Sequence, residues 1–287
     1  MMLNEILTRL SIYLKKKLPP KYKNFFLIGV AGLRLKALFW RLQGNKDDIY
    51  EKLGYHNCKK LFRISSVYHK KILKEEDYNI RATLYSELYK TIYNFVKEHL
   101  PKSETFGFNP DLINNHAELF KNKTVIDYGS GMGVSTRLLA KYAKFVYGID
   151  ASSVAVGIAK EKSKDLKNAE YRLNANPFVP FESGTIDSVY SNDLLEHLHP
   201  ADLNFHFKEI YRILKTGGRY LFWTPGSKSG PHDITQCFYP RGMGFKPKAD
   251  HIREYTFAEL ITIIQEIGYK KIELPDLRRE VLMIVTK

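Results

Sequence analysis

The chain is poor in cysteine, with only Cys58 and Cys237 among its 287 residues. Two cysteines cannot form the disulfide framework of a small secreted domain, and no C-x-x-C pair or Cys/His cluster indicates zinc. The cysteine content therefore favours a reducing compartment.

Long hydrophobic runs are also absent. The best candidate, FFLIGVAGL at residues 25–33, is interrupted by Arg34 and Lys36. A membrane-spanning helix needs about 20 apolar residues, so we expect no transmembrane span. The stretch also lacks the position and the small-residue cleavage site of a signal peptide. We therefore expect a cytoplasmic protein, peripheral to a membrane if it meets one.

Acidic residues are scarce in the first quarter of the chain. Residues 1–74 contain 17 Lys and Arg against four Asp and Glu, and they carry nearly all of the net charge of +14. Such a segment favours an anionic partner, either a membrane surface or a polyanion such as a nucleic acid. A lysine-rich solubilising surface explains the same composition, and the sequence does not decide between these interpretations.

The same segment is expected to be helical. Leucine and isoleucine recur every three or four residues over residues 1–18, and further helices are predicted over 24–42 and 77–100. Basic, aromatic-bearing helices suit an interface, so we expect membrane contact through residues 1–44. Packing against the rest of the chain, or a homodimer contact, explains the apolar stripes equally well.

From about residue 123, short β-rich runs alternate with helical stretches. This order predicts an α/β fold with a doubly wound, Rossmann-like parallel sheet. The last two predicted strands, YKKIEL and REVLMIVTK, are separated only by a short turn and must be antiparallel. We therefore divide the chain into a basic helical segment, residues 1–104, and an α/β domain, residues 105–287.

The stretch TVIDYGSGMG, residues 124–133, places three glycines directly after a predicted strand. Its G-x-G-x-G spacing is neither the G-x-G-x-x-G pyrophosphate fingerprint nor a P-loop. In an open parallel sheet this loop lies at the carboxyl ends of the strands, where ligands bind. The loop alone does not identify the ligand.

Two acidic residues narrow the choice of ligand. Asp127 precedes the loop, and Asp150 ends the next predicted strand, 21 residues after Gly129, where a ribose diol is expected. A phosphate ligand gains little from Asp127, whereas a cationic nucleoside would be attracted by both carboxylates. S-adenosylmethionine, with its sulfonium, ammonium, ribose and adenine, has this chemistry. The alternative is that Asp127 only caps groups of the loop.

Four segments in order resemble the class I S-adenosylmethionine-dependent methyltransferases: VIDYGSGMG, VYGIDAS, IDSVYSNDLLEHL and EIYRILKTGGRYLFWTP. The resemblance covers residues 105–287 and implies a seven-stranded sheet with an antiparallel seventh strand, methyltransferase activity and S-adenosylmethionine as cofactor. The cofactor-binding residues that it implies are Asp127, Gly129, Ser130, Gly131, Gly133, Asp150, Ala151, Asn174, Ala175 and Asn192. Asn174 stands where the family often has an aspartate, but an Asn carbonyl can still accept from the adenine amine.

Methyl transfer requires alignment of the acceptor, and a hydroxyl acceptor usually needs a base or a metal. His197 follows the fourth predicted strand, His232 lies in a loop rich in Gly, Ser and Pro after the fifth, and His251 precedes the last helix. We predict these three as catalytic residues, with His232 preferred as general base because such loops carry binding sites. A structural role explains each histidine as well.

A metal is an open alternative at this point. Asp193, Glu196 and His197 have i, i+3, i+4 spacing, so one helical turn would present all three, and His251 would complete a quartet. The set is similar to that of small-RNA 2′-O-methyltransferases, although their first ligand is a Glu. Many small-molecule relatives carry the Glu-His pair without a metal, so no metal ligand is predicted.

The first interpretation is a methyltransferase for a hydroxyl or amine of a small-molecule, lipid-linked or glycan acceptor. The alternative is a metal-assisted RNA 2′-O-methyltransferase that holds RNA with its basic segment. The stretch KKKLPPKYKNFF would suit phosphates and bases, but no recognised RNA-binding module is evident. A non-catalytic scaffold is disfavoured because the three glycines and both acids are present.

Overall fold

The structure is a computed structural model that describes residues 48–101, 108–176, 178–228, 230–239, 245–276 and 280–287. The helices predicted over 1–18 and 24–42, and the membrane contact predicted through residues 1–44, lie outside the described residues. No helix of the described part combines the length and the apolar composition needed to cross a bilayer.

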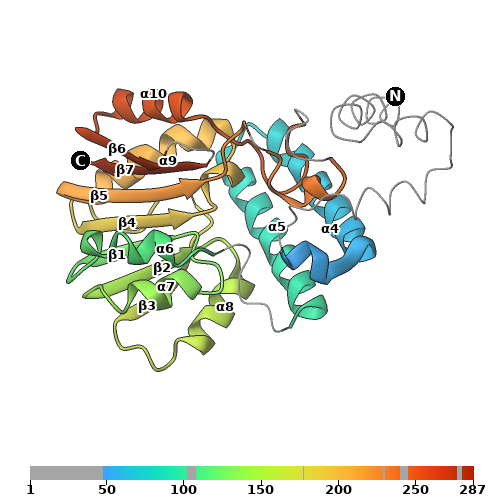
Figure 1. Cartoon of the computed structure of the whole chain (residues 1–287), viewed down its shortest axis with the longest axis horizontal. Helices are drawn as coiled ribbons and strands as arrows, with labels where there is room; N and C mark the ends of the chain where they lie inside the picture. Colours follow the sequence, from blue (N-terminus) through green and yellow to red (C-terminus); the bar gives the residue numbers. More distant parts are fainter. Residues whose placement is uncertain (1–47, 102–107, 177, 229, 240–244, 277–279) are drawn as a thin grey trace, which may run out of the picture.

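The centre of the molecule is a seven-stranded sheet in the order β3-β2-β1-β4-β5-β7-β6 (Figure 1). Its strands are β1 (Thr124–Tyr128), β2 (Phe145–Asp150), β3 (Ala169–Leu173), β4 (Ile186–Asn192), β5 (Leu214–Thr224), β6 (Lys271–Asp276) and β7 (Val281–Thr286). Strands β1 to β5 pair in parallel, and β7 pairs antiparallel with both β5 and β6. The predicted Rossmann-like sheet with an antiparallel last strand is confirmed.

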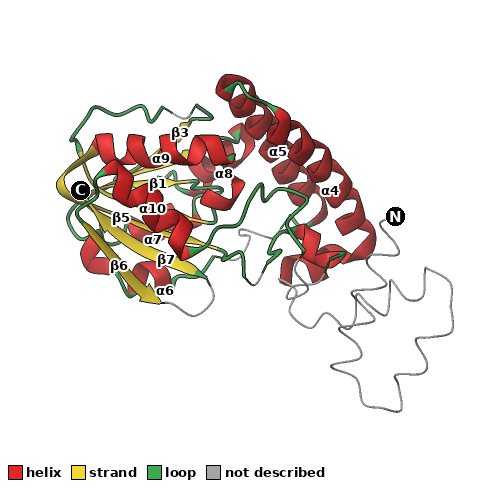
Figure 2. Cartoon of the chain, turned by 90° about the horizontal axis from the view of Figure 1, so that it is seen from above, coloured by secondary structure: helices red, strands yellow, loops and turns green. Residues whose placement is uncertain are grey.

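Helices cover both faces of the sheet (Figure 2). They are α6 (Asp111–Asn114), α7 (Val134–Leu139), α8 (Ser153–Lys162), α9 (Pro200–Ile213) and α10 (Phe257–Ile267). Successive residues of a strand point to opposite faces. In β5, Phe222 joins the core with α9 and α10, whereas Leu221 joins the core with α6 and α7. Because both faces are covered, a strand such as β7 is buried almost throughout.

Two long helices, α4 (Asp48–Lys74) and α5 (Tyr78–His99), form a hairpin beside the sheet (Figures 1 and 2). Helix α5 begins at Asp77, whose side chain accepts hydrogen bonds from the Asn79 and Ile80 amides, and the helix predicted over 77–100 is confirmed. The sequence analysis expects this part of the chain to be helical but names no separate helix over residues 48–74.

A sequence signal for α4 was nevertheless present. Four of its buried residues, Leu61, Ser65, His69 and Ile72, recur at helical spacing, but two of these four are polar. A search for purely apolar periodicity therefore overlooks them. Residue 104, the predicted boundary between the two parts of the chain, lies outside the described residues and stays a prediction.

The α4–α5 hairpin shares a hydrophobic core with the segment that follows β5. Leu88 and Ile92 of α5 belong to the same buried cluster as Ile234, Cys237 and Ile252. The hairpin and residues 230–239 and 245–252 of that segment are therefore packed together, at the end of the sheet where the parallel strands finish (Figure 1).

A buried ion pair joins α5 to α9. The Arg81 Nε donates to Asp202 Oδ2 over 2.8 Å, and a second guanidinium nitrogen donates to the other carboxylate oxygen. The Tyr85 hydroxyl also donates to Asp202 and accepts from the His199 amide over 2.7 Å. These contacts fix α5 against the turn that precedes α9.

Candidate active site

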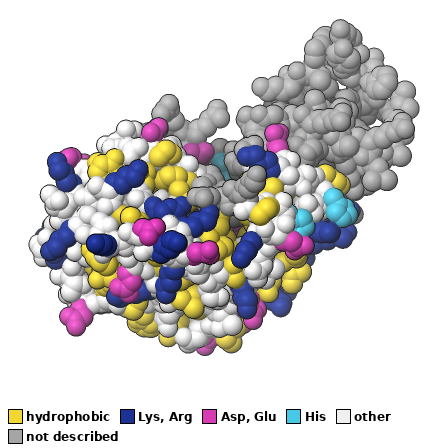
Figure 3. Space-filling model, turned by 90° about the horizontal axis from the view of Figure 1, so that it is seen from below, with side chains coloured by type: hydrophobic (Ala, Val, Ile, Leu, Met, Phe, Trp, Pro, Cys, Tyr) yellow, Lys and Arg dark blue, Asp and Glu magenta, His cyan; other side chains and the backbone are white. Residues whose placement is uncertain are grey.

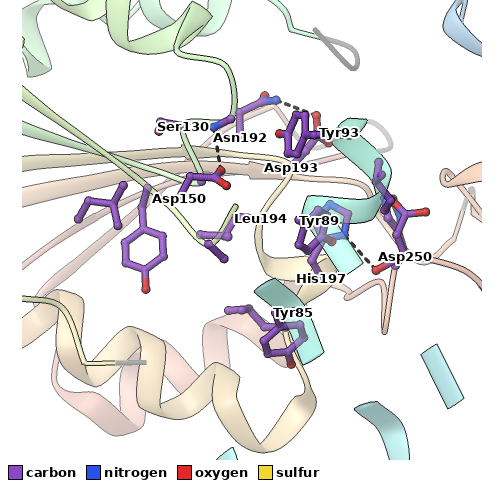
Figure 4. A pocket seen from close by; sticks show the side chains of 18 of the residues that line it. Tyr85, Tyr89, Tyr93, Ser130, Asp150, Asn192, Asp193, Leu194, His197 and Asp250 are labelled. Carbon is purple, nitrogen blue, oxygen red and sulfur yellow. Dashed lines mark hydrogen bonds between the residues drawn. The ribbon is translucent and has the colours of Figure 1, made fainter. Parts of the chain in front are cut away.

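A cavity of about 490 Å³ lies between α5 and the carboxyl ends of β1, β2 and β4. Figure 4 shows Ser130 and Asp150 on one side of it and Tyr89, Tyr93 and His197 on the other. The predicted histidines that border this cavity are His197, His232 and His251. One cavity thus joins most of the predicted cofactor residues to the predicted catalytic residues.

The glycine loop turns sharply after β1. Gly129, Gly131 and Gly133 have φ angles of 78°, 51° and 80°, which residues with a side chain rarely adopt. A Cβ atom on Gly131 would lie 2.8 Å from the Tyr93 hydroxyl, and one on Gly133 would lie 2.5 Å from the Tyr171 hydroxyl. Close packing under α5 and against β3 therefore requires glycine in addition to the turn itself.

Asp150, at the end of β2, faces the cavity. Its Oδ2 accepts from the Gly131 amide and its Oδ1 accepts from the Ser152 amide, each over 2.8 Å. Burial raises the pKa of Asp150 to about 6, although these two hydrogen bonds act in the opposite direction. The carboxylate therefore holds the glycine loop and still has lone pairs to accept ligand hydroxyls.

Asp127 lies beneath the loop. Its side chain is almost fully buried, and Oδ2 accepts from the hydroxyls of Ser135 and Thr136 over 2.6 and 2.5 Å. Burial raises its pKa to about 6. Asp150 borders the cavity and Asp127 does not, so the geometry favours the alternative in which Asp127 organises the loop. Direct contact of Asp127 with a cofactor stays a prediction.

The other predicted cofactor residues differ in their positions. Those bordering the cavity are Gly129, Ser130, Gly131, Ala151, Asn174, Ala175 and Asn192, whereas Gly133 lies behind its wall. The Ser130 hydroxyl is buried and has no hydrogen-bond partner among the described residues, so it can bind a ligand. Asn174 Oδ1 accepts from the Asn176 amide over 3.2 Å, which leaves one lone pair for a ligand amine.

Glu254 connects two of the histidines at the other end of the cavity. Its Oε1 lies 3.2 Å from His232 Nδ1 and 3.0 Å from His251 Nδ1. On the other side of its ring, His232 Nε2 lies 3.4 Å from Glu280 Oε1. The sequence analysis misses both glutamates. The position of Glu254 three residues after His251 was the only local signal.

The histidines differ in charge. Burial alone lowers the pKa of His251, but the hydrogen bond with Glu254 and the carboxylates of Asp233 and Glu196 outweigh it and raise the pKa to about 10. Burial lowers the pKa of His197. At neutral pH, and with no other cation bound, His251 is therefore charged and His197 is neutral.

Glu196 lies between His197 and His251. Its Oε1 is 3.7 Å from His197 Nε2 and 3.9 Å from His251 Nε2. Asp193 does not join this cluster. The expectation that one helical turn presents Asp193 with Glu196 and His197 is wrong, because the helical turn η3 spans only Leu195–His197 and Asp193 precedes it with a left-handed φ of 53°.

Comparison with known proteins agrees with the geometry. Residues 126–222, from β1 to β5, match the family described as "Methyltransferase domain". This match, over about a third of the chain, supports a class I S-adenosylmethionine-dependent methyltransferase domain in these residues. The cofactor of this family is S-adenosylmethionine.

Individual relatives in this methyltransferase family match only part of the chain. It is 30% identical over 125 residues to phosphoethanolamine N-methyltransferase 2 of Caenorhabditis elegans, covering 42% of this chain and 28% of the relative. It is 28% identical over 140 residues to malonyl-[acyl-carrier protein] O-methyltransferase of Marinomonas sp. (strain MWYL1), covering 48% of each. The chain thus spans less than half the length of these curated relatives.

A solved structure supports the methyltransferase fold. Phosphoethanolamine N-methyltransferase 1 of Haemonchus contortus, in complex with phosphoethanolamine and S-adenosylhomocysteine, superposes with a TM-score of 0.53 at 16% identity. The match covers 71% of this chain and 49% of that one. At this identity the likeness shows a shared fold.

Proposed function

We propose that the protein transfers a methyl group from S-adenosylmethionine to a hydroxyl or amine of a small-molecule, lipid-linked or glycan acceptor. The observation that carries this proposal is the single cavity that runs from the glycine loop and Asp150 to His197 and His232. Two relatives are named for methylating phosphoethanolamine and malonyl-acyl carrier protein. These names support an acceptor that is small or carried on a larger group.

The residues at the glycine loop fit the cofactor. Asp150 is proposed to accept the ribose hydroxyls, and the unpartnered Ser130 hydroxyl is proposed to bind a polar group of the ligand. Asn174 is proposed to accept from the adenine amine. When bound, the cofactor supplies an electrophilic methyl group, and the chain must hold an acceptor in line with it.

The residues at the other end fit an acceptor with a proton to lose. His232 borders the cavity, and its two ring nitrogens face Glu254 and Glu280. In the neutral ring the proton on Nδ1 would face Glu254, so Nε2 is the nitrogen proposed to take up the acceptor's proton, and Glu280 would stabilise the charge that results. His232 is therefore the proposed general base, and the other two histidines are proposed to position the acceptor.

The acceptor class can be tested with the purified chain, methyl-labelled S-adenosylmethionine and a cell extract separated into RNA, lipid, glycan and small-molecule fractions. We expect label in one of the last three, and none with Asp150→Ala. Label in RNA would support the alternative of a metal-assisted RNA 2′-O-methyltransferase. On the face shown in Figure 3, Lys and Arg side chains of the described residues are interspersed with Asp and Glu. Residues 1–47, which include much of the basic segment that the RNA alternative depends on, lie outside the described residues.

The pKa of Asp150 predicts how cofactor binding depends on pH. A carboxyl group with a pKa of about 6 is ionised at higher pH, and its protonation removes the charged acceptor of the ribose hydroxyls. We therefore expect the affinity for S-adenosylhomocysteine to fall about tenfold between about pH 8 and pH 5. Calorimetry across this range measures it. If the same dependence persists in Asp150→Asn, Asp150 is not its source.

A further inference from the structure

Three ligand atoms converge at the acceptor end of the cavity. Glu196 Oε1, a nitrogen of His197 and a nitrogen of His251 all lie within 4.8 Å of one another. The separations of 3.7 and 3.9 Å from Glu196 Oε1 to the two Nε2 atoms are too long for hydrogen bonds. Ligands about 2.1 Å from a tetrahedral metal ion lie about 3.4 Å apart. The two separations from Glu196 Oε1 exceed this distance by only a few tenths of an ångström.

Both imidazole rings are held with Nδ1 turned away from Glu196. His197 Nδ1 lies 3.1 Å from the Asp250 carbonyl oxygen, and His251 Nδ1 lies 3.0 Å from Glu254 Oε1. Figure 4 shows the contact between His197 and Asp250. A proton on each Nδ1 satisfies these acceptors. A metal ion that displaces the second proton of His251 would therefore meet an Nε2 lone pair from each ring. Histidines that bind metals are oriented by a carboxylate or a backbone carbonyl in this way.

Glu196 has a buried carboxylate of which only one oxygen accepts a hydrogen bond from the described residues. Its side chain is fully buried, and Oε2 accepts from the Thr224 hydroxyl over 2.8 Å. Its Oε1 has no hydrogen-bond partner among the described residues. A buried carboxylate oxygen without a partner is costly. A proton on His251 balances the charge, but it makes no hydrogen bond to Oε1 at 3.9 Å.

The cluster of Glu196, His197 and His251 opens toward the cavity. His197 and His251 both border the cavity, whereas Glu196 closes the cluster from behind. Two nitrogens and one oxygen suit a divalent transition metal, and a metal with three protein ligands keeps positions for water or substrate. Those positions would face the same space as His232.

We propose that Glu196, His197 and His251 bind one divalent transition-metal ion, whose open positions take an oxygen of the acceptor. The inference rests on the proposed function and adds the group that holds the acceptor. A metal-bound hydroxyl has a lowered pKa and gives up its proton more readily. This ion would direct the enzyme toward acceptors with a hydroxyl, and diols offer a second oxygen to the same ion. Asp193 takes no part, since it lies outside the cluster.

The probe is Co²⁺ alone, added to the purified, metal-stripped full chain without methyl donor or acceptor. We expect Co²⁺ to bind at one saturable site per chain. Calorimetry and the visible absorption of the bound ion both measure this binding. Glu196→Gln and His197→Gln should each weaken binding by about 100-fold or more. Glu254→Gln, which alters the contact that orients the His251 ring and also contacts His232, should weaken it by about 10- to 100-fold. His56→Asn, which alters an exposed histidine on α4, should bind as the wild type does.

The absence of a saturable site, or unchanged Co²⁺ affinity in both Glu196→Gln and His197→Gln, would overturn the inference. If Glu196→Gln does not fold, the Co²⁺ affinity of His197→Gln, a variant at the cavity wall, decides the test. S-adenosylhomocysteine affinity is measured on the same samples. A chain that binds this compound but no Co²⁺ contradicts only the metal site, whereas one that binds Co²⁺ but neither donor nor product contradicts the proposed function.

Discussion

Replacing Asp150 by alanine is expected to weaken S-adenosylhomocysteine binding by a factor on the order of 100 or more. Hydrogen bonds to a charged group contribute about 1.5–3 kcal/mol each, and a ribose diol would make two of them with this carboxylate. The substitution also frees the Gly131 and Ser152 amides, which Asp150 holds over 2.8 Å each. Both effects act on the same end of the cavity. Isothermal calorimetry near neutral pH measures the loss.

The matched control is Asp165→Ala, which removes an exposed carboxylate from the same domain. We expect it to bind the ligand as the wild type does. Asp150→Asn separates the two contributions, because its oxygen can still accept from one amide while the charge is gone. Wild-type affinity in Asp150→Ala would refute the assignment of this residue to the ribose.

Replacing Arg81 by alanine is expected to lower the free energy of unfolding by about 3–5 kcal/mol, because it leaves the Asp202 carboxylate buried without its partner. The Arg81 side chain is 4% exposed and that of Asp202 is 10% exposed. The guanidinium also donates to the carbonyls of Glu75 and Glu76 over 2.8 Å, so the connection between α4 and α5 loosens as well. Urea unfolding at neutral pH measures the change.

A surface ion pair provides the control for this prediction. Lys121 and Glu118 lie 3.8 Å apart and are largely exposed, so Lys121→Ala should change stability by about 1 kcal/mol at most. The double variant Arg81→Ala, Asp202→Ala should lose less than the two single variants together, since it leaves no unpaired charge. A loss in Arg81→Ala as small as that of the control would contradict the buried-pair argument.

The central sheet could be predicted from the sequence because its signals are local. The alternation of β-rich and helical stretches indicates parallel strands, and the short turn before the last strand leaves only an antiparallel pairing. The glycine loop was recognisable for the same reason. Helix α4 was not, because Ser65 and His69 occupy buried positions in its stripe.

The end of the cavity that is bordered by His197, His232 and His251 could be predicted only as a set of histidines. His232 meets Glu254, which follows it by 22 residues, and no spacing rule connects them. The exclusion of Asp193 depends on one left-handed backbone angle. The burial of Asp127 under its own loop likewise depends on two hydroxyls of the following helix. Such contacts depend on the conformation of the loops that cover the sheet, and residue spacing does not predict that conformation.

The hydrophobic core that α4 and α5 share with residues 230–239 and 245–252 has a consequence for engineering. Ile234 and Ile252 rest on apolar side chains of the hairpin, so a chimera that receives a foreign hairpin alone would leave both without matching partners. A chimera built to accept a different acceptor must therefore exchange both segments together. The sheet and its glycine loop would be kept unchanged.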